Sequence, residues 1–120
     1  MPINREDKGF IIDQMENMRT KGSRLVISLR FAGETEAARK AKKKVDMLGS
    51  TIDELLAESM KSWTGNGKSL IDDIKWANQQ LQRDINDIKK KKNLAQKSIN
   101  AFGCLDDVIV KVKDILGKIQ

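Results

Sequence analysis

The sequence contains no histidine and no tyrosine, and it has one cysteine and one proline among its 120 residues. Without histidine it lacks the usual general base and a common metal ligand. The lone Cys104 can close no disulfide within the chain and build no zinc site. Aromatic residues make up only 4% of the chain, which disfavours a sheet-rich fold. We therefore expect no enzyme, and neither a cofactor nor a metal site.

Long apolar runs are also missing. No stretch approaches the roughly 20 apolar residues that a membrane-spanning helix needs. The N-terminus lacks the basic and then apolar pattern of a signal peptide. We expect a cytoplasmic protein without membrane insertion. If the protein is secreted, a dedicated machine must recognise its fold or a tail.

Helical periodicity is what the chain has in abundance. Beyond the midpoint two series of positions recur every seven residues: Ile74, Leu81, Ile88, Ala95 and Phe102, and Ile71, Asn78, Ile85, Lys92 and Ile99. Together they form an a/d stripe on one helix. The predicted partner-binding stripe consists of Ile71, Ile74, Asn78, Leu81, Ile85 and Ile88. Within it Asn78 either fixes register and partner, as polar core positions do in coiled coils, or is tolerated at a wet edge.

A turn signal separates this helix from an earlier one. Gly65 suits the left-handed position that ends a helix, Asn66-Gly67 is a strong turn pair, and Ser69 can cap the next helix. Apolar residues spaced by three and four also precede the turn. Farther upstream, the apolar region that Gly22 interrupts and Gly33 follows is either one long helix or two pieces. We predict an all-α fold, a long antiparallel helical hairpin in a single domain over residues 1–120. Arm one covers about 5–62, the turn 63–68 and arm two about 69–119.

The midpoint turn also predicts a register, in which residue i lies roughly opposite residue 130 − i. Each arm of about 50 residues would then reach roughly 75 Å. This pairing sets Leu25 near Leu105 and gives the apolar segments at both ends of the chain a common core. Gly103 interrupts the second arm, so either the helix continues through it or a short extra helix begins after it.

Basic residues form two runs that this register places opposite each other, within a chain of formal net charge +6. The predicted basic collar consists of Lys42, Lys43, Lys44, Lys89, Lys90, Lys91 and Lys92. Such a collar either binds phosphates or an acidic helix, or is a solvated surface. A basic coiled-coil hairpin that binds nucleic acid is the alternative function. The absence of interleaved aromatic residues for base stacking weighs against it.

One motif at the turn suggests a family. Trp63-Thr64-Gly65 at the break of a helical hairpin resembles the WXG-motif (Esx-like) proteins of type VII secretion in Gram-positive bacteria. The resemblance implies a non-enzymatic protein that pairs with a partner and is exported without a signal peptide. It covers roughly residues 41 to 106, and it leaves the N-terminal 35 residues without a role.

A second motif points to a group within that family. Phe102-Gly103-Cys104-Leu105-Asp106 reads as F-x-x-x-D and is similar to the export signal of small helical partners of LXG toxins, the Lap family. The resemblance implies a targeting factor or chaperone that binds the helical N-terminal LXG region of a toxin effector. A second small helical partner and a secretion ATPase are implied as well. The composite export motif would comprise Trp63, Gly65, Phe102 and Asp106. In the other interpretation, Phe102 only ends the stripe and Asp106 is a solvated acid.

Overall fold

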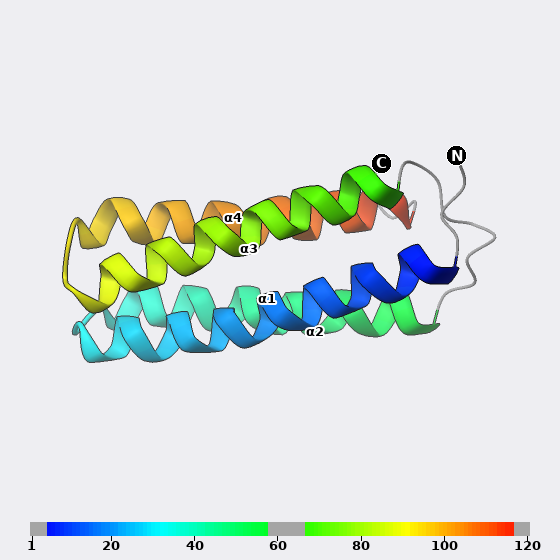
Figure 1. The fold of residues 1–120 in the computed structure, drawn as a ribbon. Coiled ribbons are helices and arrows are strands. Elements are labelled where there is room, and N and C mark those ends of the chain that lie inside the picture. Colours follow the sequence, from blue (N-terminus) through cyan, green and yellow to red (C-terminus); the bar gives the residue numbers. More distant parts are fainter. Residues whose placement is uncertain (1–4, 58–66, 117–120) are drawn as a thin grey trace.

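The computed structural model describes residues 5–57 and 67–116, and within these ranges it contains four α-helices. They are α1 (Arg5–Phe31), α2 (Thr35–Ala57), α3 (Gly67–Lys89) and α4 (Leu94–Ile115). Figure 1 shows two antiparallel pairs, α1 with α2 and α3 with α4, stacked into one bundle. The bundle measures 45 × 22 × 21 Å. No described helix is long and apolar enough to cross a bilayer.

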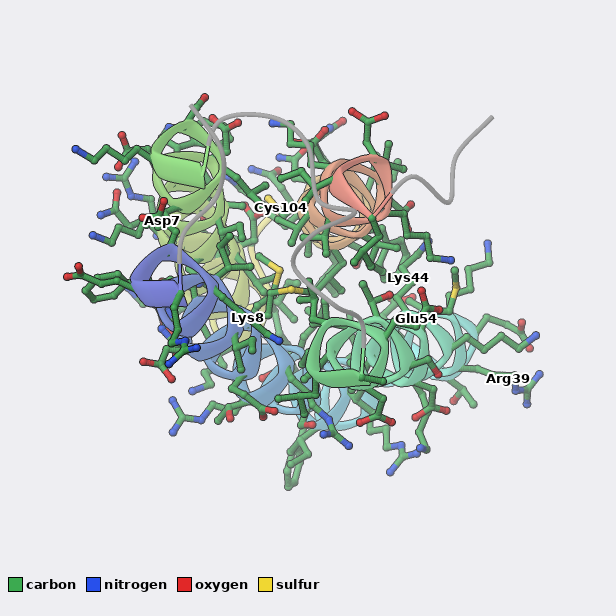
Figure 2. The ribbon with its side chains drawn as sticks, turned by 90° about the vertical axis from the view of Figure 1, so that its right-hand side faces the viewer. Asp7, Lys8, Arg39, Lys44, Glu54 and Cys104 are labelled. Carbon is green, nitrogen blue, oxygen red and sulfur yellow. The ribbon has the colours of Figure 1, made fainter. Side chains whose placement is uncertain are left out.

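The four helices lie at the corners of a square when the bundle is viewed along its length (Figure 2). Around the square α1 packs on α2, α2 on α4, α4 on α3 and α3 on α1. Although α2 and α3 follow each other in the chain, they therefore lie across the diagonal. Both short turns, residues 32–34 and 90–93, are at the same end of the bundle, which we call the turn end (Figure 1).

Each short turn is closed by a Schellman motif, the pair of backbone hydrogen bonds that ends many helices. At the end of α1 the N–H of Glu34 donates to Leu29 O (2.9 Å), and Gly33, with φ 80°, takes the left-handed position. At the end of α3 the N–H of Lys92 donates to Asp87 O (2.9 Å), and Lys91, with φ 57°, takes that position. Each motif reverses the chain within a few residues, so each of these two turns joins an antiparallel pair of helices.

The predicted all-α class is confirmed, but each predicted arm is divided in two. Arm one breaks at Gly33 and arm two at residues 90–93, so the molecule is 45 Å long instead of the expected 75 Å. The seven-residue spacing continues across the second break, but the positions after it do not belong to the buried stripe. Lys92 lies in the turn, and Ile99 is exposed. Gly103 lies inside α4, and no extra helix begins there. Helix α3 already begins at Gly67, inside the predicted turn.

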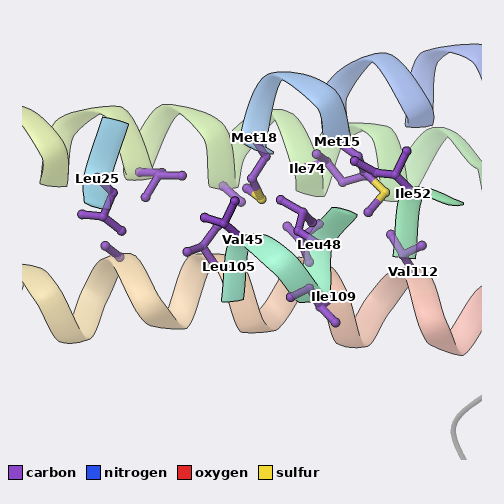
Figure 3. Packing of buried hydrophobic residues seen from close by; sticks show 14 of the residues in the cluster. Met15, Met18, Leu25, Val45, Leu48, Ile52, Ile74, Leu105, Ile109 and Val112 are labelled. Carbon is purple, nitrogen blue, oxygen red and sulfur yellow. The ribbon is translucent and has the colours of Figure 1, made fainter. Parts of the chain in front are cut away.

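The core runs along the centre of the square and contains apolar residues of all four helices (Figure 3). Leu25 and Leu105 both belong to it, so the two ends of the chain share a core as expected. Folding each arm back keeps α1 antiparallel to α4 across the diagonal, which preserves that pairing approximately. Gly22 allows α1 and α2 to approach each other closely, since a Cβ there would lie 2.7 Å from Val45 Cγ2 and 3.8 Å from Leu105 Cδ2.

Candidate functional site

The C-terminal half of the predicted export motif is displayed on α4. Phe102 and Asp106 are one helical turn apart, Phe102 half-buried against the core and Asp106 exposed. Lys44 of α2 engages both: its Nζ lies 2.7 Å from Asp106 Oδ1 and 5.7 Å from the centroid of the Phe102 ring. The two motif residues therefore share one surface with a lysine, which we call the α2–α4 face. Trp63 and Gly65 lie outside the described residues.

Geometry at this face suits recognition. The Lys44 side chain is 22% exposed and that of Asp106 is 52% exposed, so the carboxylate remains open to solvent beside its partner. A cation over an aromatic ring and a half-exposed ion pair each contribute at most about 1 kcal/mol. Another protein could therefore replace these contacts at little cost.

The predicted partner-binding stripe is not a surface in this structure, which corrects that prediction. Ile74, Leu81, Ile85 and Ile88 are fully buried, and Ile71 and Asn78 nearly so. The physical reason is that the chain folds back at its two short turns and supplies α1 and α4 as partners for the stripe. An a/d pattern indicates a buried face, but it does not tell whether the covering helix belongs to the same chain.

Asn78 joins α3 to α1. Its Nδ2 donates to Gln14 O (3.1 Å) and to Gln14 Oε1 (3.2 Å), and Lys21 Nζ donates to the backbone oxygen of Asn78 (3.2 Å). Burial, with a smaller effect from Arg24, lowers the pKa of Lys21. Asn78 Oδ1 is buried without a hydrogen-bond partner. These contacts favour the register role of Asn78, within the chain, over tolerance at a wet edge.

The predicted basic collar is not a continuous ring. Lys89 to Lys92 lie at the turn end, where α3 stops, whereas Lys42, Lys43 and Lys44 lie about two turns into α2, across the diagonal. Two of the latter are engaged locally, Lys42 with Asp46 (3.3 Å) and Lys44 with Asp106. The expectation assumed continuous arms, and the break at residues 90–93 removes the basis for it.

Sequence reasoning missed a groove between α3 and α4. Trp76 and Ile99 line it although they are 61% and 62% exposed, and a hollow of about 490 Å³ lies between the helices. Gly103 lines the same hollow, and a Cβ there would meet nothing within 4 Å. Trp76 occupies neither an a nor a d position of the heptad pattern, and this could have indicated the groove. A large aromatic residue off the apolar stripe of a helix faces solvent or a partner.

Four titratable groups also line the groove, Asp84, Lys97, Cys104 and Asp107, and the pKa values of Cys104 and Asp84 are shifted. Burial, helped by the charges of Asp84 and Asp107, raises the pKa of Cys104 to about 11, so the thiol is protonated near neutral pH. Desolvation also raises the pKa of Asp84, while Lys97 opposes the shift and Asp87 adds to it. A protonated thiol without an adjacent base is a poor nucleophile, so the geometry offers binding contacts at this point.

Lys111 forms ion pairs with two aspartates, one on α3 and one on α4. Lys111 Nζ lies 3.0 Å from Asp107 Oδ2 and 3.5 Å from Asp73 Oδ2, linking α4 to α3. The hydrogen bond to Asp107 is the largest of the effects that raise the pKa of Lys111. Within residues 5–57 and 67–116, no three of the His, Cys, Asp or Glu side chains are placed to hold a metal ion together.

Together these features define an all-helical bundle with two candidate binding surfaces, the α2–α4 face and the α3–α4 groove. Comparison with known proteins adds no identity: no family model, no curated protein and no solved structure matches the chain significantly.

Proposed function

We propose that this protein is a non-catalytic targeting partner that carries a toxin with a helical LXG region to a type VII secretion machine. The observation that carries the proposal is the α2–α4 face, where Phe102 and Asp106 stand one turn apart and are both contacted by Lys44. An aromatic ring and a carboxylate on one exposed turn are what an export receptor could read. The resemblance of Trp63-Thr64-Gly65 and of F-x-x-x-D to export motifs supports the same function.

The toxin needs a different docking surface from the buried stripe, and the α3–α4 groove supplies one. Its occupant in this proposal is one amphipathic helix of the LXG region, because an apolar helix ridge fits between Trp76 and Ile99 over the bare backbone of Gly103. Phe102 and Asp106 are not among the residues that line the groove, and Lys44 of α2 contacts both. In this proposal the toxin helix and the export receptor therefore contact different residues of α4.

Co-expression with an LXG toxin encoded by a neighbouring gene tests the function. We expect the pair to co-purify, and Trp76→Ala with Ile99→Ser to abolish the complex. Phe102→Ala or Asp106→Ala should leave the complex intact and stop export. Phe10→Ala is the control, because Phe10 is 48% exposed on α1, the helix that lies diagonally across the bundle from α4.

Three results would overturn parts of this proposal. If the pair never co-purifies, the targeting function fails. If Trp76→Ala with Ile99→Ser binds the toxin as the wild type does, the groove is not the docking surface. If Trp63→Ala retains both folding and secretion, the resemblance at the turn has no functional meaning.

A further inference from the structure

The turn end carries bulky apolar side chains among basic ones. Phe31, the last residue of α1, is 84% exposed, and Ile27 one turn earlier is 52% exposed. Both line a hollow of about 320 Å³ that α1 shares with the end of α3. Five basic residues complete this surface, which we call the basic tip: Arg30, Lys89, Lys90, Lys91 and Lys92.

Charge is strongly segregated along the bundle. The half next to the turn end, residues 19–46 and 79–104, carries fifteen Lys and Arg against five Asp and Glu. The other described half, residues 5–18, 47–57, 67–78 and 105–116, carries six against eleven. The molecule is therefore an electric dipole whose positive end is also its apolar tip, and in a field it would approach an anionic surface tip first.

The basic residues of the tip are not neutralised by the chain. Within the described ranges none of the five forms an ion pair. Of the nearby acids, Glu36 pairs with Arg39 (2.8 Å) and Asp87 with Lys97 (3.2 Å), while Glu34 in the 32–34 turn sets one carboxylate against the five basic residues. The Schellman motif holds Lys91 in a left-handed conformation, so the lysine run wraps around the end of α3 and does not continue along it.

We propose that the basic tip docks on the surface of an anionic lipid bilayer, with Phe31 and Ile27 entering the interface and the five basic residues contacting headgroup phosphates. Exposed apolar side chains ringed by lysine and arginine are the combination that interfacial binding requires. The contact is peripheral and end-on, and no helix crosses the bilayer. This inference is independent of the targeting function, and either can fail alone.

Size and chemistry favour a lipid surface over the other anionic partners. The cross-section of 22 × 21 Å limits an end-on contact to about 460 Å², whereas each partner in a stable protein complex buries roughly 800 Å². A bilayer needs no such area, because each lysine near an anionic surface and each inserted apolar group adds to binding separately. Nucleic acid would use the lysines but would leave Phe31 and Ile27 without an apolar environment.

The test is co-sedimentation of the full chain with vesicles of phosphatidylcholine containing about one-third phosphatidylglycerol, and with vesicles of phosphatidylcholine alone. We expect binding to the first and little to the second, weakening as salt rises. Lys90→Gln with Lys92→Gln should lower the partition coefficient roughly fivefold per charge removed. Phe31→Ser should lower it about tenfold without unfolding the protein, since the ring is already exposed.

Matched controls lie at the other end of the bundle. Lys75→Gln with Lys113→Gln removes the same charge, and Phe10→Ser removes a partly exposed phenyl ring from the opposite end of α1; both should bind vesicles nearly as the wild type does. Circular dichroism would confirm that all variants remain helical. A Phe31→Trp variant gives a further readout when Trp63 and Trp76 are replaced by Phe, because the fluorescence of its single tryptophan should shift to the blue on anionic vesicles.

Four outcomes would overturn the proposal. These are absence of vesicle binding at low salt, equal binding to neutral vesicles, an equal loss in the control variants, and no blue shift for Phe31→Trp. Tighter binding to a DNA duplex than to anionic vesicles at the same salt, insensitive to Phe31→Ser, would assign the tip to nucleic acid instead.

Discussion

Lys44 of α2 and Asp106 of α4 form an ion pair of 2.7 Å, between residues 62 positions apart in the sequence. The same ammonium group lies over the ring of Phe102. The pair closes one side of the square, and it connects the C-terminal half of the predicted export motif to α2. This placement makes the stability of the α2–α4 face a necessary control for any export measurement.

A double-mutant cycle of Lys44→Met and Asp106→Asn should give a coupling energy of at most about 1 kcal/mol, because the Asp106 carboxylate is half exposed and screened by water. Chemical denaturation of the four proteins measures it. A coupling of several kcal/mol would show that the pair is structural, and a loss of export in Asp106→Ala would then be ambiguous. Phe102→Leu is the companion variant that keeps the core filled while removing the ring.

Two glycine variants should move stability in opposite directions. Gly22→Ala places a methyl group 2.7 Å from Val45 Cγ2, and a β-branched side chain in a helix has little freedom to move away. We expect a loss of about 1–3 kcal/mol. At Gly103 a Cβ meets nothing within 4 Å, so Gly103→Ala should gain about 0.5–1 kcal/mol from helix propensity.

Thermal unfolding of both glycine variants is a sufficient measurement, since 1 kcal/mol shifts the midpoint by about 4 °C in a domain of this size. Equal effects in the two variants would contradict the packing of α1 against α2 at Gly22. Gly103→Ala also fills the floor of the α3–α4 groove, so toxin binding should weaken in this variant while its stability rises.

Lys91→Gly should stabilise the bundle by about 1 kcal/mol, because Lys91 adopts a positive φ that costs an L-residue energy and costs glycine none. Urea denaturation of Lys91→Gly and of Lys90→Gly compares the two positions, and Lys90 has no positive φ. Destabilisation at both would contradict the Schellman motif at the end of α3. If the basic tip binds anionic vesicles, Lys91→Gly should at the same time bind them less well.

Cys104 should react slowly with alkylating reagents in the folded protein. Its pKa is raised from 9.0 to about 11, so at pH 8 the thiolate fraction should be about 100-fold lower than in the unfolded chain. Iodoacetamide labelling with and without denaturant measures this difference. Labelling of the native protein at the rate of the unfolded chain would contradict the burial of Cys104 in the groove.

The raised pKa of Cys104 also makes the stability of the fold depend on pH. Because the folded pKa is raised, the contribution of Cys104 is fully present below about pH 9 and is lost as the pH rises toward 11, where the unfolded chain ionises first. Wild type should therefore lose more stability than Cys104→Ser over this window. The difference between the two proteins isolates the thiol from the lysines that titrate in the same range.

Much of the fold could be predicted from local pattern. The apolar segments at the two ends of the chain were assigned to a common core shared by Leu25 and Leu105, which the structure contains, whereas the stripe of α3 was assigned to a partner. The break at residues 90–93 could not be predicted from heptads, because the seven-residue spacing runs through it unchanged. Only the left-handed conformations of Lys91 and Asn93, residues without the conformational freedom of glycine, end the stripe there.

The candidate binding surfaces were harder to predict from the sequence than the fold. Phe102 and Asp106 were placed one turn apart correctly, but the contact of Lys44 with both depends on α2 lying beside α4, which the long hairpin did not contain. The α3–α4 groove escaped notice because exposure is a property of helix packing. The basic tip escaped as well, since Phe31 and Lys89 to Lys92 meet only when both arms fold back at the same end.

The amino-acid sequence by itself determined that the protein is all-helical, which face of α3 is buried, and that it has few groups for catalysis, because periodicity and composition act within single helices. The tertiary structure decided which helices cover one another. It thereby turned the predicted partner stripe into a core, brought Lys44 to Phe102 and Asp106, and gathered the lysines with Phe31 at one end. Those outcomes depend on two reversals of the chain, and each reversal rests on a few backbone hydrogen bonds whose effect reaches across the whole molecule.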